Sequence, residues 1–478
     1  MGIFRPVRLL AWGLALSPLL PPLSLLSPLF LPHLRRLPKA AWALLGIYGL
    51  SLLLPAVPLG GEALLLAALR LLYVLGLVGA GVALAPLGFR PLGYGLFLLY
   101  LSALLASYLA FGDRAASERL LHPFHSPVGL GFMGTLGILL ALHLRYPWPF
   151  RVLLGLLGGA VLLLSASRGG LLALALGGAG SVLFQRRGWL ALGAAGAVLL
   201  LAGTLEVPIA ERFFQTHLSG REGLWLAAYE VFQAHPLTGV GPYLLGDGLK
   251  GVLFGECFLF PFLEMRGVAC PEALKPFGGL WVFAHNHLLQ ALGESGLLGA
   301  LGLLLLVGGF LAGAWGDGLL FSLLLAFLAM GMVDNPFSVP SPFRGEVFFL
   351  AGGMALARGF QPPLALGLAG ASALLLSLPF LYLATRPAPP PPSLLYAAIP
   401  PGEGVGVVRL SGQGYRAQVW LCQRGCRRLG WEWDGEKPIV FAFPKDLPPG
   451  RYELRLVLFS QHRLAQRPRY VLPFEVKP

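Results

Sequence analysis

Three short polar segments stand out from an otherwise apolar chain, because their residue types could bind a charged ligand or move a proton. They are Ser165–Gly170, Gly220–Trp225 and Ala284–Gly296. In the first, glycines beside Arg168 would let a ligand approach the backbone. In the third, His285 and His287 lie at the expected start of a long apolar helix, at a boundary with water.

Each segment also has a plainer structural interpretation. A helix boundary alone would explain Arg168, and an arginine at the membrane interface would explain Arg221. Aromatic residues recur at helical spacing after Arg221, which predicts an amphipathic helix on the membrane surface. Gly239 and Gly241, in the nearby sequence His-Pro-Leu-Thr-Gly-Val-Gly-Pro, also fit a simple tight turn.

The third segment continues into the apolar run as a polar stripe. Asn286, Gln290 and Glu294 are four residues apart and would share one face of a helix. At a rise of 1.5 Å per residue, Glu294 would lie roughly 13 Å beyond His285 along the axis. A lone histidine is more often structural, but a carboxylate within a membrane is costly and is usually paired or functional.

The composition places these segments in a membrane protein. Of 478 residues, 56% are hydrophobic and only 12% are charged, against about 25% in soluble proteins. The mean hydropathy is +0.73. The net charge of +13 does not indicate nucleic-acid binding, because basic residues cluster in short loops between apolar runs, as the positive-inside bias produces.

The apolar runs predict an all-α polytopic fold with about twelve transmembrane helices. The runs are Leu9–Phe30, Ala41–Pro55, Ala63–Pro86, Leu92–Phe111, Val128–Leu144, Val152–Ser165, Leu171–Phe184, Trp189–Leu205, Leu288–Ala312, Leu319–Val333, Val347–Ala357 and Leu364–Leu383. The first run contains four prolines, which kink helices. We expect either a bent hairpin there or a single proline-broken span.

Loop charge predicts which segments face outward. With the basic loops in the cytoplasm, the extracytoplasmic segments are 112–125, 208–284, 335–344 and everything after Arg386. The stretch 208–284 is too long for a simple connection and is rich in aromatic residues, which predicts a folded cap loop. We therefore expect a transmembrane catalytic domain over residues 1–385.

A second domain is expected beyond the membrane helices. Residues 386–396 are rich in proline and predict a semi-rigid linker. Residues 397–478 contain short alternating segments with turn residues between them, which predicts a small extracytoplasmic β-sandwich. In Arg451–Leu458, for example, the alternation places Tyr452, Leu454, Leu456 and Leu458 on one face of a half-buried strand. Four cysteines lie in two local pairs, Cys257 with Cys270 and Cys422 with Cys426, which indicates two disulfides in an oxidising compartment. Four unpaired thiols are the alternative.

In this order and spacing, the polar motifs resemble those of the O-antigen ligase superfamily, which includes O-antigen polymerases and bacterial protein O-oligosaccharyltransferases. The matching elements are S-x-S-R-G at Ser165–Gly169, G-R with Trp225 at Gly220–Arg221, H-P-L-x-G-x-G at His235–Gly241, and H-N-x-x-L-Q with E-x-G-x-x-G at His285–Gly299. The resemblance covers roughly residues 120–333. The β-domain lies outside it.

The resemblance implies a GT-C-like enzyme at the outer face of the cytoplasmic membrane. Such an enzyme moves a glycan from a polyprenyl (undecaprenyl) diphosphate carrier to the hydroxyl of a glycan, lipid or protein acceptor. His285 would be the general base, while Arg168 and Arg221 would stabilise the diphosphate leaving group. The expected substrate-binding residues are Asn286, His287, Gln290, Glu294, Gly239 and Gly241.

No cofactor or metal is expected, because the acidic residues of the outer loops form no D-x-D or D-D cluster. Metal-independent, direct displacement would invert the anomeric centre. Two alternatives stay open. One is a polymerase that joins lipid-linked repeat units by the same donor chemistry. The other, from a different class, is a flippase or transporter of lipid-linked glycans, although no internal repeat is evident.

Overall fold

The described residues of the chain fall into two compact units. The computed structural model describes residues 4–476 apart from 113–114, 116–117, 205–210, 215–220, 250–281, 342–344, 386–392, 399–404, 412–414, 424–425, 432–437, 443–446 and 461–468. The first unit comprises Met1–His217 and Ala227–Ser377, and the second comprises Leu218–Leu226 and Leu378–Pro478. Cys257, Cys270 and most of the predicted cap loop lie outside the described residues.

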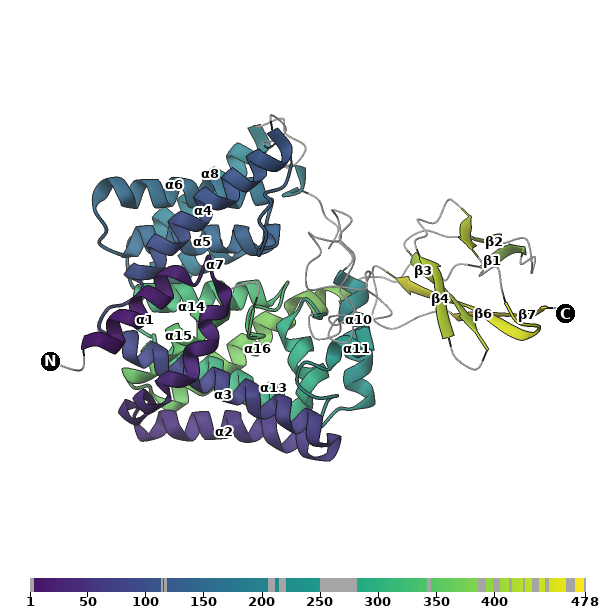
Figure 1. Ribbon diagram of the computed structural model, residues 1–478, viewed down its shortest axis with the longest axis horizontal. Coiled ribbons are helices and arrows are strands. Elements are labelled where there is room, and N and C mark those ends of the chain that lie inside the picture. Colours follow the sequence, from purple (N-terminus) through teal and green to yellow (C-terminus); the bar gives the residue numbers. More distant parts are fainter. Residues whose placement is uncertain are drawn as a thin grey trace. The chain divides into compact units, whose positions relative to one another are not determined.

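The first unit is helical (Figure 1). Its elements are α1 Phe4–Leu16, η1 Pro21–Arg36, α2 Lys39–Ala56, η2 Val57–Leu59, α3 Gly61–Leu84, α4 Arg90–Phe111, α5 Pro127–His143, α6 Trp148–Ser165, α7 Arg168–Val182, α8 Gly188–Thr204, α11 Leu245–Leu249, α13 His287–Gly313, α14 Gly318–Gly331 and α15 Gly345–Ala357. Helices α10, Arg221–Ala234, and α16, Pro362–Thr385, contain residues of both units.

The helices confirm a multi-pass membrane protein. Among the described residues, six stretches are long and apolar enough to cross a membrane, namely Lys39–Leu59, Gly61–Leu84, Arg90–Phe111, Trp148–Ser165, His287–Gly313 and Pro362–Tyr382. Four shorter apolar helices, α5, α8, α14 and α15, accompany them. The predicted number of about twelve crossings is therefore confirmed only as a multi-pass arrangement.

The proline-rich first run is not one continuous α-helix. Helix α1 ends at Leu16, and the chain continues as the 3₁₀ helix η1, which contains Pro28 and Pro32. Proline has no backbone N–H and clashes with the preceding turn of an α-helix, so these residues prevent an α-helix from continuing through the run. Element η1 packs on α3 instead.

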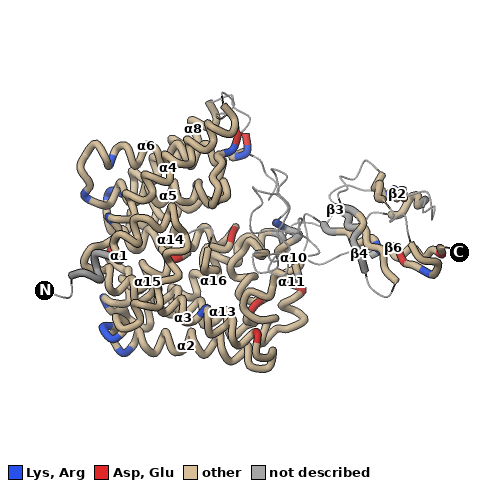
Figure 2. The backbone as a smooth tube through the Cα atoms, viewed as in Figure 1, with Lys and Arg blue, Asp and Glu red and all other residues tan. Residues whose placement is uncertain are grey.

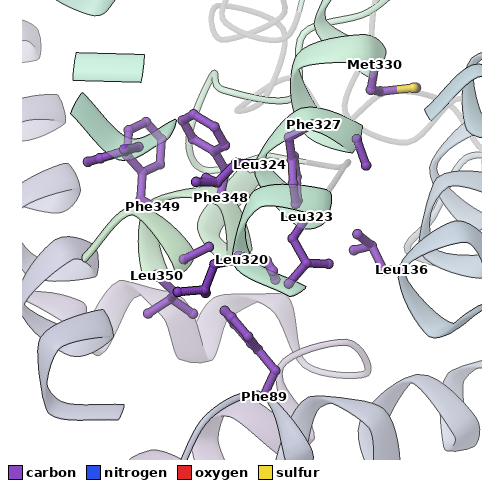
Figure 3. Packing of buried hydrophobic residues seen from close by; sticks show 14 of the residues in the cluster. Phe89, Leu136, Leu320, Leu323, Leu324, Phe327, Met330, Phe348, Phe349 and Leu350 are labelled. Atoms are coloured by element: carbon purple, nitrogen blue, oxygen red, sulfur yellow. The ribbon is translucent and has the colours of Figure 1, made fainter. Parts of the chain in front are cut away.

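Buried apolar side chains from several helices form one large hydrophobic cluster in this unit. Figure 3 shows part of it, where Leu320, Leu323 and Phe327 of α14 lie near Phe348 and the residues around it in α15. The rings of Phe327 and Phe348 are 5.8 Å apart between centroids. Helix α14 also packs along α7 and contacts α13 and α15. Side chains from these three helices can therefore lie near its C-terminal end.

Charged residues of the helical unit lie mainly at helix ends. Figure 2 shows most of its Lys and Arg positions on the left of the view, where helices are joined by short connections. Two of these connections are the basic segments between η1 and α2 and between α5 and α6. Grouping on one side is what the positive-inside bias produces. Which side faces the cytoplasm stays a prediction.

The strands belong to the second unit and form two sheets. One has the order β1-β2-β5, and the other has the order β4-β3-β6-β7. Their bounds are β1 Leu394–Ala398, β2 Val405–Leu410, β3 Tyr415–Cys422, β4 Cys426–Trp431, β5 Ile439–Ala442, β6 Gly450–Ser460 and β7 Arg469–Val476. Strand β1 begins within the stretch predicted as a linker.

Residues of both sheets contribute to one hydrophobic cluster. Tyr452, Leu454, Leu456 and Leu458 are buried there, on the face that the period-two pattern of β6 predicts. Strands β3 and β4 pair with Cys422 opposite Cys426. This register fits the disulfide predicted for the hairpin, which stays a prediction like the one between Cys257 and Cys270.

Candidate functional site

His285 precedes α13 and pairs with a buried aspartate that follows α14. Its Nδ1 lies 2.8 Å from Oδ1 of Asp334, and the side chains of His285 and Asp334 are 24% and 1% exposed. A carboxylate only accepts hydrogen bonds, so Nδ1 is the donor and the lone pair of the neutral ring is on Nε2. Asp334 thereby fixes the tautomer in which Nε2 can accept a proton.

The local backbone places His285 at the edge of the helix. His285 has a left-handed backbone, with a φ of 52°. Asn286, the next residue, is the N-cap of α13 and accepts a hydrogen bond from the backbone N–H of Leu289 at 3.0 Å. Its amide also donates to the carbonyls of Met332 and Leu376, each at 2.9 Å. Asn286 thus ties the start of α13 to the segment that carries Asp334.

His287 has a different environment from His285, two residues away. It is 5% exposed, and its ring lies 4.5 Å from the ring of Phe337 in an edge-on arrangement. The structure therefore buries His287 within the protein packing and leaves His285 partly exposed.

The rest of the polar stripe points into the protein. Gln290 and Glu294 are each 2% exposed. Oε1 of Glu294 accepts hydrogen bonds from Nε2 of Gln290 at 2.7 Å and from the backbone N–H of Tyr243 at 3.0 Å. Arg70 of α3 forms an ion pair with Oε2 of Glu294, and its guanidinium lies 3.8 Å from the centre of the Tyr243 ring. Glycan binding by these residues stays a prediction, whereas their buried contacts hold segments together.

Helix α13 is broken at Gly296, whose φ of 64° and ψ of −163° are not helical. In an unbroken helix, the N–H of Leu297 would donate to the carbonyl of Gly293. Here Leu297 N donates to the carbonyl of Pro236 at 2.9 Å, and Gly293 O accepts from the N–H of Val240 at 2.9 Å. The loop 236–241 therefore fills the break.

The glycines of both motifs permit this close contact. Gly239 and Gly241 have positive φ angles of 62° and 108°. A Cβ atom on Gly239 would lie 2.3 Å from the carbonyl carbon of Glu294, and one on Gly296 would lie 2.2 Å from the carbonyl oxygen of Leu237. The H-P-L-x-G-x-G and E-x-G motifs are thus two halves of one contact, which gives Gly239 and Gly241 a structural role beside their predicted role in binding.

Arg168 lies near the same end of α14. Helix α6 ends at Ser165, Ala166 adopts a left-handed backbone, and Ser167 caps α7 by accepting from Gly170 N at 3.1 Å. Arg168 is the first residue of α7 and is half-buried. The next residue, Gly169, packs against side chains of Met330 and Val333, immediately before Asp334. The Arg168 turn and the His285–Asp334 pair therefore adjoin one segment of chain.

Arg221 begins α10 and is half-buried. It belongs to the compact unit that contains the strands, whereas Arg168 and His285 belong to the helical unit. Trp225, four residues on, is fully buried, and the rings of Tyr229 and Phe232 are 6.2 Å apart. The helix predicted to start at Arg221 is confirmed.

The sequence alone did not predict a role for Asp334, Arg70 or Tyr243. A signal existed for Arg70, because it is a charged residue inside the apolar run Ala63–Pro86. Asp334 follows the apolar run Leu319–Val333 directly but has no motif around it. Within the described part of the chain, no group of three or more His, Cys, Asp or Glu residues could hold a metal ion. Metal independence itself stays a prediction.

Part of the chain is similar to a known protein family. Residues 152–304 match the family model described as O-antigen ligase. This range contains every site residue that the sequence analysis selected, from Arg168 to Glu294, but neither Arg70 nor Asp334. A search of curated proteins found no match.

Proposed function

We infer that this chain is a membrane glycosyltransferase of the O-antigen ligase superfamily, because it carries the domain of that family over residues 152–304. We propose that it transfers a glycan from a polyprenyl (undecaprenyl) diphosphate to an acceptor hydroxyl. The observation that carries the proposal is the His285–Asp334 pair, since it supplies a partly exposed histidine with a defined tautomer.

In the proposed reaction, Nε2 of His285 takes the proton of the acceptor hydroxyl. The hydroxyl oxygen then forms a bond to the anomeric carbon, while the bond from that carbon to the diphosphate oxygen breaks. The imidazolium is stabilised by the Asp334 carboxylate at 2.8 Å. Because one bond forms as the other breaks on the opposite face, the anomeric centre inverts.

The leaving diphosphate gains negative charge, which arginine stabilises well because its planar guanidinium binds phosphate oxygens in pairs and stays protonated. Arg168 supports this role by its place at the first position of α7, where the helix dipole also favours an anion. Arg221 is proposed for the same role from its motif. No metal ion takes part in the proposed mechanism.

The proposal also assigns the chain to the cytoplasmic membrane. About twelve GT-C-like membrane segments would place His285 and the β-strand unit on the extracytoplasmic side, with the basic connections inside. There, a membrane-embedded lipid carrier and a water-borne acceptor reach the same histidine.

The test is to incubate the purified full chain in lipid vesicles with a polyprenyl-diphosphate glycan and candidate acceptors, and to identify the product by mass. A glycan on lipid A core, pilin or another acceptor indicates a ligase, and a lengthened lipid-linked glycan indicates a polymerase. Donor that crosses the bilayer unchanged would indicate a flippase and contradict the proposal. His285→Ala should abolish transfer and leave expression and donor binding intact.

A further inference from the structure

A buried ion pair lies behind the candidate site and is linked to it by hydrogen bonds. Arg70 and Glu294 come from helices α3 and α13, and their side chains are 10% and 2% exposed. Removing two charges from water costs more than their attraction generally returns, so such a pair is weak evidence of a stabilising role. Its contacts point instead to a role in placing other groups.

The first link from this pair is Gln290, one turn before Glu294. Nε2 of Gln290 donates to Oε1 of Glu294 at 2.7 Å, which sets the orientation of the Gln290 amide. With its nitrogen held in this way, the amide directs its oxygen towards the start of α13. The ion pair thus determines where the Gln290 oxygen lies.

The second link joins Gln290 to a residue adjacent in sequence to each member of the His285–Asp334 pair. Its Oε1 accepts from the backbone N–H of Ala284 at 2.8 Å and from Nδ2 of Asn335 at 3.2 Å. Ala284 directly precedes His285, and Asn335 directly follows Asp334. One amide oxygen therefore holds the two chain segments whose side chains must meet 2.8 Å apart.

Tyr243 extends the same arrangement to the loops. Its backbone N–H donates to Glu294, its ring lies under the Arg70 guanidinium, and its hydroxyl donates to the carbonyl of Val339. Val339 belongs to the connection after α14 that carries Asp334. The ion pair is therefore fastened to both segments of the site, through Gln290 and through Tyr243.

We propose that Arg70, Glu294 and Gln290 are positioning residues that set the geometry of the His285–Asp334 pair. This inference rests on the proposed function for its catalytic readout. Arg70 would act from α3, two hydrogen-bonded residues away from the segment that holds His285, and would not touch the substrate.

The test uses the double variant Arg70→Gln/Glu294→Gln, which removes both charges and leaves neither one buried alone. Two measurements are made on folded protein in lipid vesicles. One is kcat and KM for glycan transfer. The other is the rate at which diethyl pyrocarbonate modifies His285, followed by mass spectrometry, with buried His287 as the protected reference. We expect kcat to fall at least tenfold, the donor KM to change less than threefold, and the His285 modification rate to change at least threefold.

Arg358→Gln is the matched control, because Arg358 pairs with Asp317 at the opposite end of α14. The 14 residues of α14 between the two ends span about 21 Å, so this variant should retain wild-type kcat and His285 reactivity. A double variant with wild-type kcat and wild-type His285 reactivity would overturn the proposal. If the double variant does not fold, Gln290→Met decides by the same two measurements.

The two proposals fail separately. If the wild-type chain transfers no glycan, the proposed function is wrong, and the modification rate of His285 still reports whether Arg70, Glu294 and Gln290 position it. If transfer occurs and neither measurement changes in the variants, the positioning role alone is wrong.

Discussion

His285 and His287 are two residues apart in the same motif, yet the protein treats them in opposite ways. His285 lies outside the helix, is partly exposed and donates to Asp334. His287 lies inside the first turn, is 5% exposed and packs against Phe337. Although the motif has two histidines, it therefore contains one candidate base, which is identified by the hydrogen-bond partner and the exposure of each ring.

The largest expected effect separates the two histidines directly. His285→Ala removes the proposed base and should lower kcat by at least about a hundredfold, within the range for loss of general-base catalysis. His287→Phe keeps an aromatic ring in the packing and should change kcat less than about threefold. Transfer rates on matched amounts of folded protein measure both. Equal losses of kcat in the two variants would contradict the assignment of His285, and not His287, as the base.

Asp334→Asn tests whether the activity of His285 depends on the charge of the carboxylate that pairs with it. The amide can accept from Nδ1, but it carries no charge to stabilise the imidazolium, so kcat should fall about ten- to a hundredfold. Ser338→Ala lies in the same connection, at a hydroxyl with no hydrogen-bond partner among the described residues, and serves as the comparison. Wild-type kcat in Asp334→Asn would assign the activity of His285 to exposure alone.

Gly296→Ala tests the break that ends the half-helix after His287. Its φ of 64° and the carbonyl of Leu237 leave no room for a methyl group, so we expect a loss of about 1–3 kcal/mol in stability. Gly370→Ala in α16, where nothing lies within 4 Å, should be neutral or slightly stabilising. Thermal unfolding in detergent compares them. Equal thermal midpoints in the two variants would contradict the close contact between Gly296 and the loop 236–241.

The smallest expected effect concerns a histidine whose burial serves no proposed chemistry. Burial lowers the pKa of His122, in the connection between α4 and α5, from 6.5 to about 4. The folded protein keeps this ring neutral where the unfolded chain protonates it. Its contribution to stability is therefore complete above pH 6.5 and is lost as the pH falls from 6.5 to 4.

His122→Gln should reduce this dependence on pH. Between pH 7 and 5, the thermal midpoint of the wild type should fall further than that of the variant. Neighbouring His125, whose ring is 5.0 Å away, is present in both proteins and cancels in the comparison. A larger fall in the variant would show that the shift has the opposite sign.

Local patterns predicted much of the architecture. The apolar runs correspond to helices, and the alternation in Arg451–Leu458 predicted which side chains of β6 are buried. The polar stripe predicted that Gln290 and Glu294 share a face, since helical spacing alone decides this. Contacts with other helices and loops determine that this face points into the protein, and no local pattern contains that information.

Long-range contacts account for what was missed. Asp334 is 49 residues from His285, and Arg70 is 224 residues from Glu294. Neither pair has a spacing that a sequence pattern can reveal. The break at Gly296 was missed for a related reason. Leu288–Ala312 has the pattern of one continuous apolar helix, and only the contact with the loop 236–241, which lies far away in the sequence, explains the break.

The broken α13 has a consequence for biogenesis. Leaving the backbone N–H of Leu297 and the carbonyl of Gly293 without partners in lipid would be costly, so this helix is a poor candidate for entering the bilayer alone. Its missing partners, Pro236 and Val240, are synthesised more than fifty residues earlier and are already available when α13 emerges from the ribosome. Moving the 236–241 loop after α13 by circular permutation would reverse that order, and it should lower the yield of inserted protein even though every contact of the finished fold is retained.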